Sequence, residues 1–134
     1  MWLKTFGIVV VVASVIGFIL YAATNSTDVS DWYLERSYDK NAPACEDKLI
    51  TAAWYCNLVT NYDYATKLYR RVIEDHPECP RAAEAQYEAA MCIKRSNSDL
   101  KGAKAEFQKV VDFYPTTSFA AEARIHIRKI ELAQ

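Results

Sequence analysis

The chain has 134 residues, with 16 basic and 17 acidic side chains and a formal net charge of −1. This length holds one modest domain, and the balanced charge gives no electrostatic reason to expect a nucleic acid as partner. Only three glycines and four prolines occur. Their scarcity favours regular structure, and the Ala, Glu, Lys, Leu and Tyr that dominate after residue 40 favour helix.

The first predicted element is a membrane-spanning helix within residues 1–23. Residues 6–23 (FGIVVVVASVIGFILYAA) carry no charge, and roughly 20 apolar residues of helix suffice to cross the hydrocarbon core. The alternative is a cleaved signal peptide, which has a shorter apolar run and a small-x-small cleavage site. Tyr21 stands where that site needs a small residue. We therefore expect a retained anchor, with membrane lipid around residues 2–23.

The charges on either side of this segment predict its orientation. Lys4 precedes the apolar run, whereas Asp28 and Asp31 follow it, and basic residues tend to stay in the cytoplasm. The N-terminus is therefore expected in the cytoplasm and the rest of the chain outside it. Within the span, Ala13 and Gly17 form a small-xxx-small pair, which lets another membrane helix approach closely.

Residues 24–42 are predicted to be a polar linker. Within it, residues 31–38 (DWYLERSY) are expected to form a short helix capped by Ser30. This segment either lies on the membrane surface or folds back onto the domain that follows. Its apolar side chains are Trp32, Tyr33 and Leu34.

The remainder of the chain contains an internal repeat whose interval is 38 residues (107 − 69 = 38). An interval in this range is typical of stacked supersecondary units, and the apolar positions fall at helical spacing. Pro77 and Pro80 end one helix and open the next, so each unit is predicted to be a pair of antiparallel helices. The expected helices are 43–59, 62–76, 80–95, 99–114 and 117–132. The equivalent pairs are Ala65 and Ala103, Tyr69 and Phe107, Val72 and Val110, Ile73 and Val111, Pro77 and Pro115, and Ala83 and Ala121.

This pattern resembles the tetratricopeptide repeat (TPR) family over roughly residues 43–132. The family's second-helix pattern matches Ala65, Tyr69, Val72 and Pro77, and again Ala103, Phe107, Val110 and Pro115, while the first helices carry Ala53 and Ala90. The interval is longer than the family's common 34 residues. The resemblance implies an all-α fold. It consists of a single N-terminal transmembrane helix followed, over residues 43–134, by a short TPR-like α-solenoid of two hairpins plus a capping helix.

The dipeptide Tyr114-Pro115 before the last helix resembles bacterial envelope members of that family. With the flanking charges, this implies a single-pass protein of the bacterial inner (cytoplasmic) membrane. The N-terminus would lie in the cytoplasm and the C-terminal domain in the periplasm.

The four cysteines are Cys45, Cys56, Cys79 and Cys92. No C-x-x-C cluster occurs, so we expect no metal site. Outside the cytoplasm, four cysteines suggest two disulfides. In the layout that the TPR resemblance implies, the first helices of successive repeats run side by side, which pairs Cys45 with Cys79 and Cys56 with Cys92. Four reduced, buried thiols are the alternative.

No set of residues predicts catalysis. His76 and His126 both lie within helical patterns, and no Gly-rich phosphate loop is present. We expect no catalytic residues, no cofactor and no enzymatic activity. His76 precedes Pro77 at a helix C-terminus, where an imidazole suits the helix dipole.

The TPR resemblance implies a concave groove that binds a helix or an extended peptide of a protein partner. The alternative is that residues 31–38 fill the groove. We therefore expect a membrane-anchored TPR-like scaffold or adaptor at the outer face of the membrane. A small accessory structural subunit of a larger membrane complex, such as an energy-transducing one, is the second hypothesis. The groove positions carried over by motif are Ile50, Trp54, Tyr87, Met91 and Ile125.

Overall fold

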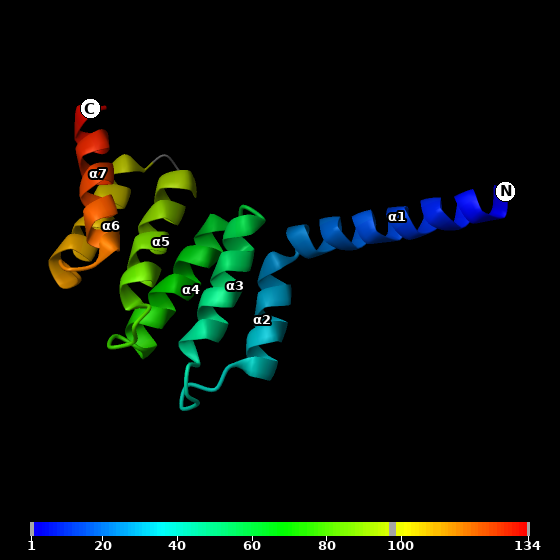
Figure 1. Cartoon of the computed structure of the whole chain (residues 1–134), viewed down its shortest axis with the longest axis horizontal. Helices are drawn as coiled ribbons and strands as arrows, with labels where there is room; N and C mark the ends of the chain where they lie inside the picture. The colour runs from blue at the N-terminus through cyan, green and yellow to red at the C-terminus, as the bar shows by residue number, and fades with distance from the viewer. Residues whose placement is uncertain (1, 97–98, 134) are drawn as a thin grey trace.

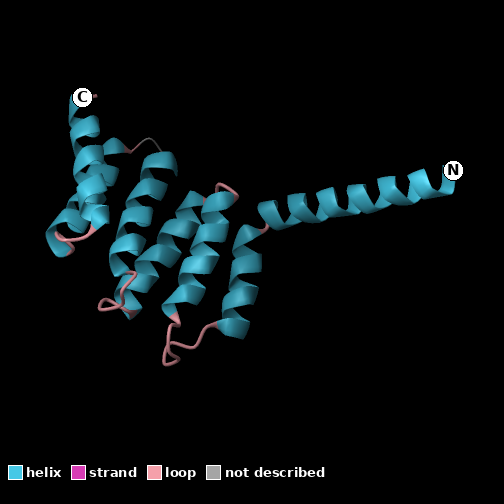
Figure 2. Ribbon diagram, viewed as in Figure 1, coloured by secondary structure: helices cyan, strands magenta, loops and turns pink. Residues whose placement is uncertain are grey.

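The computed structural model describes residues 2–96 and 99–133, and within these ranges the chain forms seven α-helices and no strand (Figure 1; Figure 2). The all-α prediction is thus confirmed for the described residues. The helices are α1 (Trp2–Thr24), α2 (Ser26–Ser37), α3 (Glu46–Leu58), α4 (Tyr62–Asp75), α5 (Ala82–Ser96), α6 (Leu100–Phe113) and α7 (Ser118–Leu132).

Helix α1 projects away from the other helices, which stand in a row (Figure 1). Its window Gly7–Thr24 has a mean hydropathy of 2.4, and none of the window is buried. At 1.5 Å per residue, these 18 residues span roughly 27 Å, close to the thickness of the hydrocarbon core. The described chain therefore has one helix that is long and apolar enough to cross a membrane. The side chain of Lys4, on which the predicted orientation partly depends, lies outside the described residues.

Helix α2 begins earlier than the sequence suggested. The predicted helix started after Ser30, but α2 starts at Ser26 and follows α1 with only Asn25 between them. The Asn25 N–H donates to the Tyr21 carbonyl at 2.9 Å, and the Val29 N–H donates to the Asn25 carbonyl at 3.0 Å. Because these hydrogen bonds continue through the bend, the polar residues after α1 are helical and do not form a loose linker.

Three side-chain hydrogen bonds, which we call the anchor contacts, fix the end of α1 and the start of α2 to the helices that follow. The Tyr55 hydroxyl donates to the Ala22 carbonyl at 2.6 Å. The Asn61 side-chain amide donates to the hydroxyls of Ser26 at 2.8 Å and Thr27 at 3.1 Å. The end of α1 is therefore attached directly to α3, and the start of α2 to the residue that caps α4.

Helices α3 to α7 pack in chain order, each mainly against the next, and α5 also contacts α7. Their bounds lie within three residues of the predicted ranges, and the starts of α4, α6 and α7 have a local signal. The side-chain oxygens of Asn61, Asp99 and Thr117 accept backbone N–H groups in the first turns of α4, α6 and α7.

The repeated apolar positions form the core, as predicted. Tyr69 and Val72 of α4 are 2% and 0% exposed, and their equivalents Phe107 and Val110 of α6 are both 0% exposed. The small residues Ala65 and Ala103 are also fully buried, which lets neighbouring helices approach closely. Leu34 of α2 belongs to the same core as α3 and α4, so α2 is an integral part of the helix row.

Candidate functional site

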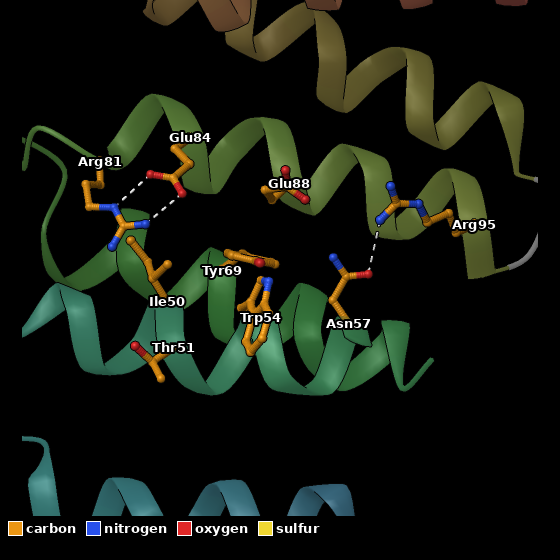
Figure 3. A pocket seen from close by; sticks show the side chains of 9 residues that line it. All are labelled: Ile50, Thr51, Trp54, Asn57, Tyr69, Arg81, Glu84, Glu88 and Arg95. Atoms are coloured by element: carbon orange, nitrogen blue, oxygen red, sulfur yellow. Dashed lines mark hydrogen bonds and ion pairs between the residues drawn. The ribbon is translucent and has the colours of Figure 1, made fainter. Parts of the chain in front are cut away.

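An open pocket of about 380 Å³ lies between α3 and α5 (Figure 3). Tyr69 of α4 lies at its floor, beside Trp54 of α3. Ile50 and Trp54 are one turn apart on α3 and share a face. Ile50 is only 4% exposed, whereas Trp54 is 58% exposed and presents its ring at the mouth. The lining residues are Ile50, Thr51, Trp54, Asn57, Tyr69, Arg81, Glu84, Glu88 and Arg95.

Polar bridges close both ends of this pocket. Arg81 donates to both carboxylate oxygens of Glu84 at 2.7 Å, and its third nitrogen donates to Asp47 at 2.7 Å. The bidentate pair with Glu84 orients the guanidinium, and the hydrogen bond to Asp47 joins the start of α5 to the start of α3. At the other end, Arg95 donates to the side-chain oxygen of Asn57 at 3.1 Å. Side-chain hydrogen bonds therefore connect α3 and α5 at both ends of the pocket, and the pocket lies between these connections.

Glu88 lies between the two bridges, across from Trp54 and Tyr69 (Figure 3). In the part of the chain that the structure describes, its carboxylate forms no salt bridge. Burial raises the pKa of Glu88, and Arg95 partly opposes that shift. A half-buried carboxylate next to an exposed indole ring suits the cationic side chain of a ligand, because the carboxylate attracts its charge and the ring face adds a cation–π contact.

The five predicted groove residues do not form one groove. Ile50 and Trp54 line the pocket, but Tyr87 is 7% exposed and packs against Phe107 and Phe119, with ring centroids 5.7 and 5.5 Å apart. Met91 is half-buried in the same cluster as Tyr87. Ile125 lies on α7, 54% exposed. The structure does not bring these three to the pocket, because Tyr87 and Met91 pack toward α6 and α7 and Ile125 lies on α7; their contact with a partner stays a prediction.

Thr51 and Asn57 of the pocket were not predicted from the sequence, and neither were its four charged residues: Arg81, Glu84, Glu88 and Arg95. Their spacing places them along one face of α5, so helical periodicity was the signal that could have identified them. The TPR pattern specifies small and apolar positions, so it does not identify this charged face of α5.

Residues 31–38 do not fill the pocket. Leu34 is buried and Tyr33 is half-buried against α3 and α4, and Trp32 is 57% exposed. None of these side chains lines the pocket. Figure 3 shows α2 on the side of α3 opposite to it.

All four cysteines are free, so neither predicted disulfide is formed. The Cys45 thiol lies 3.3 Å from Nε2 of His76, and the Cys56 thiol lies 3.0 Å from the Ser30 hydroxyl. The prediction failed because the 38-residue interval places Lys94, and not Cys92, at the position of Cys56 (94 − 56 = 38). Burial raises the pKa of the Cys56 and Cys79 thiols, and that of Cys92 to about 12.

His76 ends α4, as predicted, but its ring has more contacts than a simple cap needs. Its Nε2 lies 3.0 Å from the Tyr38 hydroxyl and 3.3 Å from the Cys45 thiol, and Tyr38 also donates to Asp75 at 3.0 Å. A thiol beside an imidazole is a pair that some enzymes use for nucleophilic attack. Cys45 is only 5% exposed, however, so a substrate has little access to it. The group fastens the loop before α3 to the end of α4.

Neither a protein-family model nor any curated protein matches the chain. The pocket and the apolar helix α1 are therefore the features of this chain that indicate a function.

Proposed function

We propose that the protein is a membrane-anchored, TPR-like scaffold that holds a segment of a partner protein in the pocket between α3 and α5. The observation that carries this proposal is the exposed Trp54 ring across the pocket from the Glu88 carboxylate, which forms no salt bridge within the described residues. Trp is enriched among residues that dominate binding energy. The chemistry of the pocket favours a partner segment that presents a lysine or arginine side chain.

The TPR-like interpretation is supported by the repeated second helices. Ala65, Tyr69 and Val72 in α4 recur as Ala103, Phe107 and Val110 in α6, and all six residues are buried. Successive helices pack in chain order, and α5 also contacts α7, as stacked hairpins require.

The proposed location is the bacterial inner membrane, with the N-terminus in the cytoplasm and α2–α7 in the periplasm. The apolar, unburied α1 supports a membrane location. Lys4, which precedes the apolar run in the sequence, supports placing the N-terminus in the cytoplasm and the helix row outside it.

The test is partner capture by the full-length chain from native membranes after chemical cross-linking. Trp54→Ala and Glu88→Lys should each reduce recovery of the cross-linked partner by tenfold or more, because they remove the ring and reverse the charge. Leu58→Ala is the matched control, since Leu58 lies on the same helix, is 63% exposed and does not line the pocket. If all three variants recover the partner as wild type does, the pocket is not the docking site.

One observation favours the second hypothesis, an accessory subunit of a larger membrane complex. Ala13 and Gly17 are both exposed on α1, and a Cβ added at Gly17 would meet nothing within 4 Å. Another membrane helix can therefore approach closely there. A permanent subunit co-purifies stoichiometrically in mild detergent and withstands salt, and Gly17→Leu should then release it. Persistence of the complex in Gly17→Leu would rule out this contact.

A further inference from the structure

The outward face of α7 repeats a face that α3 and α5 both bury. The 38-residue interval relates Leu49, Tyr87 and Ile125, and also Ala52, Ala90 and Arg128 (87 − 49 = 38; 125 − 87 = 38). Leu49 and Tyr87 are 0% and 7% exposed, but Ile125 is 54% exposed. The equivalent face is therefore buried in α3 and α5 and exposed in α7.

The difference arises from the helix that follows. In the first two units, the face of α3 packs against α4 and the face of α5 packs against α6. Helix α7 has the corresponding inner contacts, since Ala120, Ala123 and Ile130 are buried against the preceding helices. Among the described residues, no helix follows α7, and its face stays open. Helix α7 thus corresponds to the first helix of a third hairpin. The exposed positions of the face are Ala121, Arg124, Ile125, Arg128, Lys129 and Leu132.

The charges on this face indicate what would cover it. In the second unit, the Gln86 amide donates to the Glu106 carboxylate of α6 at 2.7 Å. The position of Gln86 corresponds to Arg124 in α7 (124 − 86 = 38). Arg124, Arg128 and Lys129 form no salt bridge within the described chain. A helix with acidic side chains would supply their partners, and its apolar stripe would cover Ile125 and Leu132.

We propose that the outward face of α7 binds an acidic amphipathic helix of a partner protein, which completes the third hairpin in trans. The helix packs on α7 as α6 packs on α5, with a small residue and an aromatic residue four positions later, as in Ala103 and Phe107. This surface is separate from the pocket between α3 and α5, so either site can fail without the other.

The test uses the full-length chain in mild detergent and two fluorescent peptides. One peptide has the sequence of residues 99–114 with Lys104→Glu and Lys109→Glu, and the other keeps both lysines. Each contains an i,i+4 lactam bridge on its outer face, because an isolated helix of this length is marginal in water. Measured by fluorescence anisotropy, the acidic peptide should bind at least tenfold more tightly than the peptide that keeps both lysines. Added salt should reduce this difference in affinity.

Protein variants decide whether binding occurs at α7. Ile125→Asp and Leu132→Asp should each weaken binding of the acidic peptide by tenfold or more. Phe113→Asp is the matched control, since Phe113 is 71% exposed on α6 and should leave binding unchanged. Equal affinity for both peptides, no binding of either, or no effect of Ile125→Asp would overturn the proposal. One more outcome would overturn the proposal: the chain binds neither peptide but self-associates, and Ile125→Asp makes it monomeric. That result would identify a second copy of the chain as the occupant of this face.

Discussion

Replacing Glu106 with alanine should strongly destabilise the helix row. Glu106 is 7% exposed, and it receives hydrogen bonds from Arg70 of α4 at 2.8 Å and Gln86 of α5 at 2.7 Å. Lys109, on the same helix, donates at 3.1 Å. One carboxylate therefore connects three consecutive helices, α4, α5 and α6.

The magnitude follows from what each donor loses. The Gln86 side chain is buried, and a buried donor left without an acceptor costs about 1–3 kcal/mol. Truncation to alanine also removes one methylene, Cγ, from a largely buried site, which adds about 0.8 kcal/mol. Arg70 and Lys109 are 48% and 51% exposed along their side chains, so both can turn to water at little cost. The expected loss is about 2–4 kcal/mol, which lowers the Tm by about 10 °C or more.

The assay is thermal unfolding of the full-length chain in detergent, followed by far-UV circular dichroism. Glu131→Ala is the matched control, because Glu131 also pairs with a lysine, Lys104, at 2.8 Å but is 52% exposed. Such a surface pair contributes about 1 kcal/mol at most. Equal Tm losses in Glu106→Ala and Glu131→Ala would refute the argument that burial makes this carboxylate important.

The pH dependence gives an independent check on Glu106. Burial alone would raise the pKa of this carboxyl, but the hydrogen bonds from Lys109, Arg70 and Gln86 outweigh it, and the pKa is lowered. A group with a lowered folded pKa stabilises the protein above its unfolded pKa and loses that contribution as the pH falls through its folded pKa. The stability difference between wild type and Glu106→Gln should therefore be largest near neutral pH and shrink in acid. A difference that is constant with pH would contradict the role of the charge.

Two further predictions concern the membrane side and the thiols. A reporter fused after Gln134 should be active only outside the cytoplasm, and activity restricted to the cytoplasm would reverse the proposed orientation. Without reductant, alkylation of the denatured chain should add four adducts by mass spectrometry, since all four cysteines are free; two or fewer adducts would contradict the structure. In the folded chain at pH 8, Cys56 and Cys92 should remain unmodified for longer than Cys79, because both are fully buried while Cys79 is half-buried.

Local signals made the helices predictable from sequence. These signals are recognisable in the sequence alone: Pro77, the capping residues Asn61, Asp99 and Thr117, and the repeated apolar positions. Helix α2 was less predictable, because Ser26 reads as a linker residue and becomes helical through its contact with Asn61. That contact joins residues far apart in the chain, so no local pattern could indicate it.

The candidate site was only half predictable for a different reason. Ile50 and Trp54 were identified from the family pattern, but the same pattern placed Tyr87 and Ile125 beside them. The chain's own 38-residue interval relates Ile50 to Glu88 and Leu49 to Tyr87 (88 − 50 = 38). An error of one position on a helix rotates a side chain by about 100°, which is enough to exchange a pocket residue for a core residue. The repeat interval was the better guide to which side chains share a face.

The anchor contacts have a consequence for how far the protein can reach. A tether of seven disordered residues would let a domain wander by roughly 15 Å, and a partner could be met at many heights above the bilayer. The hydrogen bonds of Tyr55 and Asn61 to the end of α1 and the start of α2 remove that freedom. If α1 spans a membrane as proposed, Trp54 and Glu88 lie at a fixed height and orientation above the lipid surface, and only a partner segment that reaches that height can contact them.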